Sequence, residues 1–315
     1  MTNLLKIKNL NLFFVENQAL YNINLNLKKG NLHALVGESG CGKTMTAMTI
    51  MRLLPKSANI RSGEVIFDGT NLLYLKDKQM RELRGNKIAL IPQDPMTSLN
   101  PLYTIGNQLI ESIKVHSRVS DNQAKRKAKE VMELVKIPDS ETKLKFYPHE
   151  FSGGMKQRVI IAMALATNAE LIIADEPTTA LDVTIQKQIM NLLEEIKKEF
   201  GTTILLISHD LALVSNYADY ISVMYSGHIV EEAPSEEFFK NPLHPYSQAL
   251  LNSLPSKNPA FKLKIIEGAP PSIQEKISGC KFYPRCEFCD LNICSKQEPH
   301  LIEKDVNHFS ACLIK

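Results

Sequence analysis

Apolar positions along the chain follow two spacings, which predict where strands and helices lie. Alternation with a period of two at residues 5–10 and 23–27 predicts two strands of an antiparallel flap. Helical spacing predicts a helix at residues 45–54 and a helical insertion, with no convincing strand, over about residues 96–166. Short apolar runs predict further strands at residues 32–36, 63–67, 87–92, 171–176 and 203–208, and a hairpin at 221–225 and 227–231. The predicted fold class is therefore α/β.

The loop between the predicted strand at 32–36 and the helix that follows fits the phosphate-loop pattern G-x-x-x-x-G-K-[ST]. Glycines in such a loop let backbone N–H groups turn toward phosphates, Lys43 adds a positive charge, and the Thr44 hydroxyl can ligate Mg²⁺. Cys41 is interpreted either as a thiol open to oxidation or alkylation or as an inert substitute for serine. The loop consists of Gly37, Glu38, Ser39, Gly40, Cys41, Gly42, Lys43 and Thr44.

Polar residues follow the later apolar strands where each strand ends. The strand at 87–92 leads to Gln93, the strand at 171–176 ends in Asp175 and Glu176, and the strand at 203–208 leads to His209. In an open parallel sheet, ligands bind at this carboxyl edge. Asp175 can hold Mg²⁺ and Glu176 can polarise an attacking water, whereas a lone histidine after a strand is more often structural.

Two further features can bind nucleotide. Ser152 is a plausible N-cap for a helix that begins at Gly153 and Gly154, and free N–H groups at such an end bind anions. Phe13 and Phe14 offer an aromatic face for a base, or they are two core phenylalanines.

In this order and spacing, the motifs over residues 4–235 resemble the nucleotide-binding subunits of ABC transporters, which carry a P-loop NTPase fold with a mixed sheet, an antiparallel flap and an inserted helical subdomain. The resemblance implies ATP and Mg²⁺ as ligands. It matches Phe14 to the adenine-stacking aromatic, Gln93 to the Q-loop glutamine, and Ser152 to Gln157 to the signature. It also matches Asp175 to the Walker B aspartate, Glu176 to the catalytic glutamate, the segment 180–182 to the D-loop and His209 to the switch histidine. The resemblance implies that the Mg²⁺ ligands are Thr44, Gln93 and Asp175.

Two signature positions depart from the usual Leu-Ser-Gly-Gly-Gln, with Phe151 for the leucine and Met155 for the glutamine. The Ser-Gly-Gly-Met form is similar to the oligopeptide, dipeptide and nickel permease branch. That branch implies an importer whose two ATPase subunits, more often two different chains, face head to tail beneath two membrane subunits, with an external binding protein. We interpret the chain as the ATP-hydrolysing subunit of an importer of di- and oligopeptides. The alternatives are a nickel or metallophore importer, a soluble ABC ATPase and a poorly hydrolysing ATP-binding partner.

The chain after residue 235 has a Pro-rich turn, a predicted helix at 248–254 and a linker at 256–277. The turn and helix resemble the C-terminal extension of the peptide-permease ATPases. Five of the six cysteines follow residue 279. The residues alone leave cluster ligation, zinc and unligated thiols open. The resemblance implies a [4Fe–4S] cluster on Cys280, Cys286, Cys294 and Cys312, with Cys289 surplus, although Cys286 and Cys289 form a zinc-type pair.

Composition limits the setting of the protein. A net charge of +3 over 315 residues gives no dense basic patch for nucleic acid. No apolar run approaches the roughly 18 residues of a membrane span, and the N-terminus does not read as a signal peptide. We therefore expect a cytosolic chain. The resemblance implies that it is a subunit at the cytoplasmic face of the cell membrane, with a nucleotide-binding domain at 1–235 and the extension at 236–315.

Overall fold

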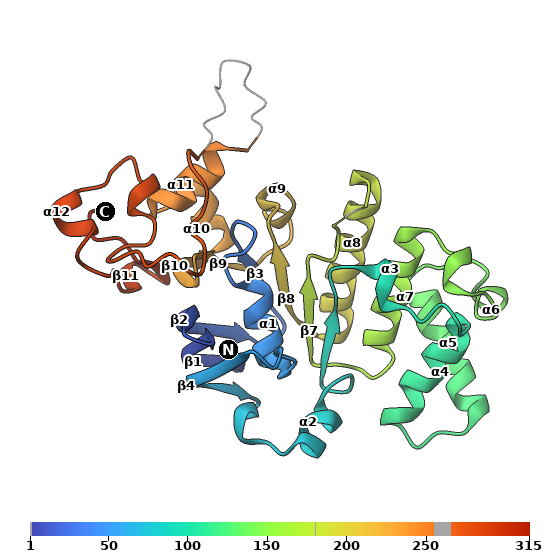
Figure 1. Cartoon of the computed structure of the whole chain (residues 1–315). Coiled ribbons are helices and arrows are strands. Elements are labelled where there is room, and N and C mark those ends of the chain that lie inside the picture. The colour runs from blue at the N-terminus through green and yellow to red at the C-terminus, as the bar shows by residue number, and fades with distance from the viewer. Residues whose placement is uncertain (1, 180, 255–265) are drawn as a thin grey trace. The chain divides into compact units, whose positions relative to one another are not determined.

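The computed structural model describes residues 2–179, 181–254 and 266–315 (Figure 1). The chain forms two compact units, which are described separately. The phosphate-loop unit comprises the residues up to Leu73 together with Ile207–Lys315, and the helical unit comprises Tyr74–Leu206. Residues 256–265 of the predicted linker lie outside the described residues.

The phosphate-loop unit holds two sheets and several short helices. Its strands are β1 (Asn3–Phe14), β2 (Asn17–Lys28), β3 (Leu32–Val36), β4 (Ala58–Phe67), β5 (Thr70–Asn71), β9 (Tyr220–Tyr225), β10 (His228–Pro234), β11 (Ile302–Asp305) and β12 (His308–Ser310). Its helices are α1 (Lys43–Met51), α9 (Leu211–Val214), α10 (Ser235–Lys240), α11 (Pro245–Asn252), α12 (Leu291–Cys294) and a 3-10 helix at Tyr283–Arg285.

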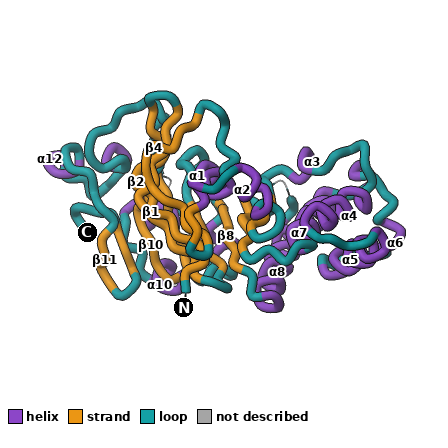
Figure 2. The backbone as a smooth tube through the Cα atoms, turned by 90° about the horizontal axis from the view of Figure 1, so that it is seen from below, coloured by secondary structure: helices purple, strands orange, loops and turns teal. Residues whose placement is uncertain are grey.

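The predicted antiparallel flap is confirmed. β1 pairs antiparallel with β2 and with β4, and the strands follow the order β2-β1-β4-β5. Figure 2 shows β1, β2 and β4 together. Alternate residues of β1 and β2, such as Leu5, Ile7 and Leu25, are fully or almost fully buried. The period-two pattern therefore arises because one face of the flap is packed and the other is polar.

The second sheet of this unit supports the phosphate loop. β3 runs parallel to β9, with Val36 opposite Val223, and β9 forms the predicted hairpin with β10. All five residues of β3 are buried, which explains its unbroken apolar run. β12 then pairs with β10, and β11 pairs with β12. The chain after residue 235 therefore adds two strands to the sheet of the phosphate-loop unit.

The helical unit contains a parallel strand pair and a group of helices. Its elements are α2 (Asp77–Leu83), β6 (Ile88–Ile91), α3 (Pro95–Ser98), α4 (Ile105–His116), α5 (Asp121–Leu134), α6 (Ser140–Lys143), α7 (Gly153–Leu165), β7 (Leu171–Asp175), α8 (Val183–Phe200) and β8 (Thr203–Ser208), whose end passes into the other unit. No strand lies between β6 and β7, as predicted, and α4, α5 and α7 pack on one another there (Figures 1 and 2). No helix in the described residues is long and apolar enough to cross a membrane.

Candidate functional site

The phosphate loop connects β3 to α1 through backbone conformations that favour glycine. Gly37 and Gly42 have φ angles of 154° and 110°. A Cβ at Gly37 would lie 2.1 Å from the carbonyl oxygen of Met224, and one at Gly42 would lie 2.8 Å from side-chain carbons of Leu20 and Met224. Both positions therefore exclude a side chain. Because Gly42 is the N-cap of α1, the helix begins at Lys43, two residues earlier than its apolar pattern indicates.

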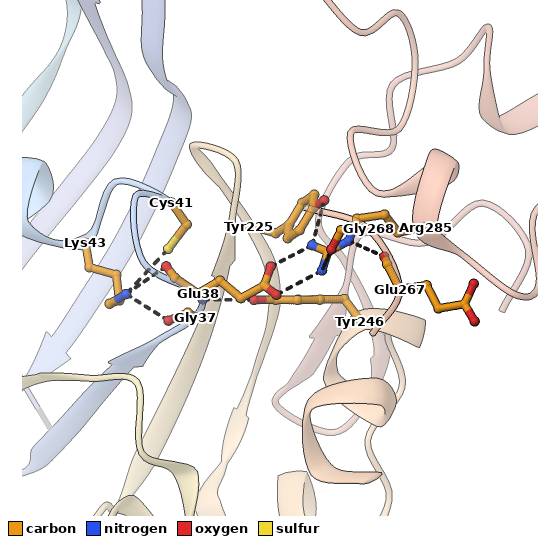
Figure 3. A network of polar contacts seen from close by, with 9 residues as sticks. All are labelled: Gly37, Glu38, Cys41, Lys43, Tyr225, Tyr246, Glu267, Gly268 and Arg285. Carbon is orange, nitrogen blue, oxygen red and sulfur yellow. Dashed lines mark hydrogen bonds and ion pairs between the residues drawn. The ribbon is translucent and has the colours of Figure 1, made fainter. Parts of the chain in front are cut away.

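Lys43 lies inside the loop that it serves. Its side chain is buried, and its Nζ donates to the carbonyl oxygens of Gly37 at 2.8 Å and Glu38 at 3.0 Å (Figure 3). The ammonium group is thus held beside the backbone that is expected to receive phosphate. Thr44 follows in the first turn of α1 and is half-buried, which is the position expected of a Mg²⁺ ligand.

Cys41 is a packed residue of the phosphate loop. The residue is 4% exposed, and its Sγ lies 3.8 Å from the Nζ of Lys43. Burial raises the pKa of the Cys41 thiol, against the opposing effect of the nearby Lys43 ammonium. The thiolate is the reactive form of cysteine, so these observations favour the inert interpretation of Cys41.

We predict that Cys41 reacts with a maleimide at pH 7.5 at least about tenfold more slowly in the folded protein than in the protein unfolded by guanidinium, because burial both blocks access and keeps the thiol protonated. Mass spectrometry of tryptic peptides at timed intervals measures the rate. Labelling of folded Cys41 as fast as in the unfolded chain contradicts the prediction.

In the helical unit, the predicted carboxylates and Gln93 meet at one edge of a parallel strand pair. β6 and β7 are in register with Ile91 opposite Ala174, so Gln93 and Glu176 follow their strands at the same edge. The Nε2 of Gln93 donates to Oε2 of Glu176 at 3.0 Å, and the Thr179 hydroxyl donates to the same oxygen at 3.1 Å. These contacts hold the Glu176 carboxylate in one orientation.

Asp175 and Glu176 have different surroundings although they are neighbours in sequence. Asp175 is the last residue of β7 and is 2% exposed, whereas Glu176 is half-buried and has a φ angle of 47°. The backbone turns at Glu176, so the difference in burial between the two carboxylates arises from the end of the strand as well as from strand alternation. A carboxylate held by donors beside solvent can orient a water molecule, and a buried one can serve a cation.

The predicted signature lies at the start of α7. Ser152 is the N-cap, as predicted, and its Oγ accepts a hydrogen bond from the Met155 N–H at 3.4 Å. Ser152 is exposed, Gly153 half-exposed and Gly154 buried. Asp182 caps α8 by accepting from the Ile185 N–H at 3.0 Å. Ala180, the first residue of the predicted D-loop, lies outside the described residues.

The two remaining predicted nucleotide residues both lie in the phosphate-loop unit. Phe14 ends β1 and is half-buried, while the guanidinium of Arg61 covers the neighbouring Phe13 ring at 3.8 Å from its centroid. His209 directly follows β8, is exposed, and precedes Asp210, which caps α9. The nucleotide roles of Phe14 and His209 stay predictions.

Four of the C-terminal cysteines share one cavity in the phosphate-loop unit. Among the residues that line it are Cys280, Cys286, Cys294 and Cys312, together with apolar side chains including Phe282 and Phe288. Cys289 is described in the structure but does not line this cavity. Burial raises the pKa values of Cys280 and Cys286 to about 11, with smaller contributions from the neighbouring thiols. Four soft sulfur donors around one cavity are a chemically suitable set for a metal cluster.

In the described ranges, however, no group of three or more His, Cys, Asp or Glu side chains is arranged to hold a metal ion, so a cluster on these cysteines stays a prediction.

Sequence analysis did not identify two residues that contact the phosphate loop. Arg285 donates to both carboxylate oxygens of Glu38, at 2.7 and 3.0 Å, and the hydroxyl of Tyr246 accepts from the Glu38 N–H at 2.9 Å (Figure 3). The contacts span 247 and 208 positions in sequence, so no local pattern predicts them. The local signals were that Tyr246 lies in the Pro-rich turn and that Arg285 directly precedes a predicted cysteine ligand.

Comparison with known families and proteins gives consistent results. Residues 20–179 match the family described as ABC transporter, and residues 230–294 match the C-terminal region of oligopeptide/dipeptide transporters. The chain is 49% identical to a probable peptide ABC transporter ATP-binding protein of Sinorhizobium fredii, over 94% of this chain and 89% of that protein. It is 44% identical to the oligopeptide transport ATP-binding protein OppD of Bacillus subtilis, over 98% and 88% of the two chains.

Solved structures agree with these matches. A dimeric ATP-binding cassette in a post-hydrolysis state, bound to ADP and Pi, has a TM-score of 0.66 and 29% identity, and the alignment covers 73% of this chain and 98% of that one. A component of the ABC transporter complex cbiONQ from Clostridium perfringens has a TM-score of 0.67 and 28% identity, over 76% and 92% of the two chains.

Proposed function

This chain belongs to the ABC transporter family, as an ATP-hydrolysing subunit of the oligopeptide and dipeptide branch, and from that premise we propose that it powers the import of di- and oligopeptides. The observation that carries the cargo assignment is the joint match to the cassette and to the peptide-transporter C-terminal region. Relatives at 41–49% identity are named for peptide, oligopeptide or dipeptide transport.

We assign the chemistry of ATP hydrolysis to residues at the carboxyl ends of the strands. Glu176 is the general base, which accepts a proton from the water that attacks the γ-phosphate. Gln93 and Thr179 orient its carboxylate through their hydrogen bonds. His209 is proposed to contact the γ-phosphate side of the site, and Lys43 to neutralise phosphate charge from within the phosphate loop. The attacking water transfers its proton to Glu176 as the bond from the γ-phosphorus to the ADP oxygen breaks.

Nucleotide binding also needs Mg²⁺, which supplies positive charge against the β- and γ-phosphate oxygens. Thr44 offers a hydroxyl, Gln93 a side-chain carbonyl and Asp175 a buried carboxylate, and these are the hard oxygen donors that Mg²⁺ prefers. We propose these three residues as its protein ligands. Phe14 is proposed to stack on the adenine, and the N-terminus of α7, from Ser152 to Gly154, to bind phosphate.

The proposed assembly is a pair of ATPase subunits beneath two membrane subunits. Ser152 is exposed at the start of α7, so it is available to complete an ATP site on a second ATPase subunit. A similar cassette has been solved as a dimer. We propose that the second ATPase is a related chain, that both lie at the cytoplasmic face of the membrane, and that an external binding protein supplies the cargo.

We further propose that Cys280, Cys286, Cys294 and Cys312 hold a [4Fe–4S] cluster. Support comes from the shared cavity that these four residues line and from its apolar neighbours, which suit an iron–sulfur group. A bound cluster would supply a cross-link between distant segments of the extension, since ATP hydrolysis has no redox step. Zinc is the alternative to the cluster, and measurement of the iron and zinc content distinguishes the two.

Transport by cells that depend on this chain tests the cargo proposal. Cells lacking other peptide and nickel importers are given the complete transporter with wild-type chain or with Glu176→Gln, and uptake of labelled dipeptide and of labelled nickel is measured. We expect dipeptide uptake to fall to background in the variant while nickel uptake is equal in both strains. Loss of nickel uptake alone would show that the cargo is nickel. No change in the uptake of dipeptide or of nickel would contradict transport by this chain.

A further inference from the structure

We propose that Arg285 is a positioning residue of the ATP site: from the C-terminal extension it holds Glu38, and through Glu38 the phosphate loop, in the shape that receives ATP. This inference rests on the proposed ATP site but not on the cargo. Its starting point is the network in Figure 3, in which Glu38 lies between Lys43 and Arg285.

Glu38 is fixed at three points. Its carboxylate accepts two hydrogen bonds from the Arg285 guanidinium, its backbone N–H donates to the Tyr246 hydroxyl, and its carbonyl accepts from the Nζ of Lys43. Two of these three contacts come from the extension. The extension therefore determines the orientation of the second residue of the phosphate loop and one of the two carbonyl oxygens that accept from Lys43.

Arg285 is itself well anchored. Its side chain is 6% exposed, and besides Glu38 it donates to the carbonyl oxygens of Glu267 and Gly268 and to the Tyr225 hydroxyl. A two-pronged arginine–carboxylate pair that is largely removed from water fixes both partners, and loss of one leaves the other charge unpaired. These contacts make Arg285 a rigid support for Glu38.

Charge gives the pair a second effect on ATP. Glu38 places a carboxylate within a loop that is expected to bind a polyanion, and an unpaired carboxylate there would repel the triphosphate. The guanidinium of Arg285 neutralises this carboxylate at 2.7 Å. Removal of Arg285 should therefore weaken ATP binding both by freeing the loop and by exposing a negative charge.

Arg285 is flanked in the chain by residues of the cavity lined by Cys280, Cys286, Cys294 and Cys312, called the thiol cavity below. Arg285 lies in the 3-10 helix Tyr283–Arg285, between Cys280 and Cys286, which both line the cavity. The turn is closed by hydrogen bonds from the Tyr283 N–H to the Cys280 carbonyl and from the Cys286 N–H to the Tyr283 carbonyl. The neighbouring Phe282 packs against the rings of Tyr246 and Tyr225, at 5.3 and 5.2 Å between centroids. A change at the cysteines of this cavity should therefore shift the Arg285 side chain and, through it, the Glu38 carboxylate.

Binding of a fluorescent ATP analogue to the purified full-length chain tests the proposal. We expect Arg285→Gln to raise the Kd about tenfold and Arg285→Lys, which keeps the charge but not the two-pronged geometry, to raise it about threefold. In Glu38→Gln/Arg285→Gln the repelling charge is absent, so the Kd should lie between those of Arg285→Gln and the wild type. Lys296→Gln removes an exposed positive charge from the same extension and should leave the Kd unchanged.

In the assembled transporter, Arg285→Gln should raise the KM for ATP by a similar factor and leave kcat within about twofold, because the general base is untouched. A purely structural defect would instead lower kcat and the melting temperature together. If Arg285→Gln does not fold, Arg285→Lys provides the test. A wild-type Kd for Arg285→Gln, or for Arg285→Lys where Arg285→Gln does not fold, would overturn the proposal.

The link to the cavity has its own test. Cys286→Ser should raise the Kd for the ATP analogue toward that of Arg285→Gln, whereas Cys289→Ser, outside the cavity, should not. Equal Kd values for these two variants would overturn the link. Failure of the proposed transport function gives a different result, namely normal ATP binding by the wild-type chain with no change in peptide uptake on Glu176→Gln.

Discussion

Replacement of Glu176 by glutamine is expected to lower ATP turnover of the assembled transporter by about 100-fold or more, the usual loss when a general base is removed. The KM for ATP should change less than about twofold, because glutamine has the same size and can still accept the hydrogen bond from Gln93. Phosphate release over a range of ATP concentrations measures both constants.

A matched control for this variant is Glu195→Gln. Glu195 lies on α8, is 51% exposed at its side chain and pairs with Lys136 at 2.7 Å, so its loss should leave turnover within about twofold. If Glu176→Gln keeps wild-type turnover, the proton is accepted elsewhere. Binding of ATP by the variant, measured separately, distinguishes lost chemistry from lost binding.

The second large expected effect is a loss of iron and sulfide when a cysteine of the thiol cavity is replaced. Protein purified without oxygen should contain about four iron and four sulfide per chain, as a [4Fe–4S] cluster requires, and Cys286→Ser should lose most of both because it replaces one of the four proposed thiolate ligands. Iron and sulfide analysis together with the visible absorption spectrum measures the loss.

Cys289→Ser is the internal control for the cluster, because Cys289 is a neighbouring thiol that does not line the cavity. It should keep wild-type iron and sulfide content. A content of about one zinc per chain and no iron would instead support the zinc alternative. Equal iron content in the Cys286→Ser and Cys289→Ser variants would contradict the assigned ligands.

The sequence was most informative where one short segment determines its own structure. The apolar run at 32–36 predicts β3 with its observed ends, and the alternation in residues 5–10 predicts a strand of the flap. Ser152 could be identified as an N-cap because capping is a local interaction. The helix predicted at 248–254 begins instead at Pro245, where a proline at the first helical position was the local signal that was missed.

Long-range contacts could not be predicted from local patterns. The strands β11 and β12 are short, and β11 is exposed along its length, so neither has a strong apolar pattern. β12 is positioned by pairing with β10, and β11 by pairing with β12. The contact of Arg285 with Glu38 likewise joins residues 247 positions apart. Only the folded chain brings such residues together.

The division of the chain also affects the order in which the protein can fold during synthesis. The helical unit is one continuous segment, Tyr74–Leu206, so all of its residues have been made before the last third of the chain appears. β3, by contrast, pairs with β9 through residues such as His33 and Tyr220, which are separated by 187 positions in the chain. The nascent N-terminal segment, with its phosphate loop, must therefore wait for most of the polypeptide to leave the ribosome before its sheet can close.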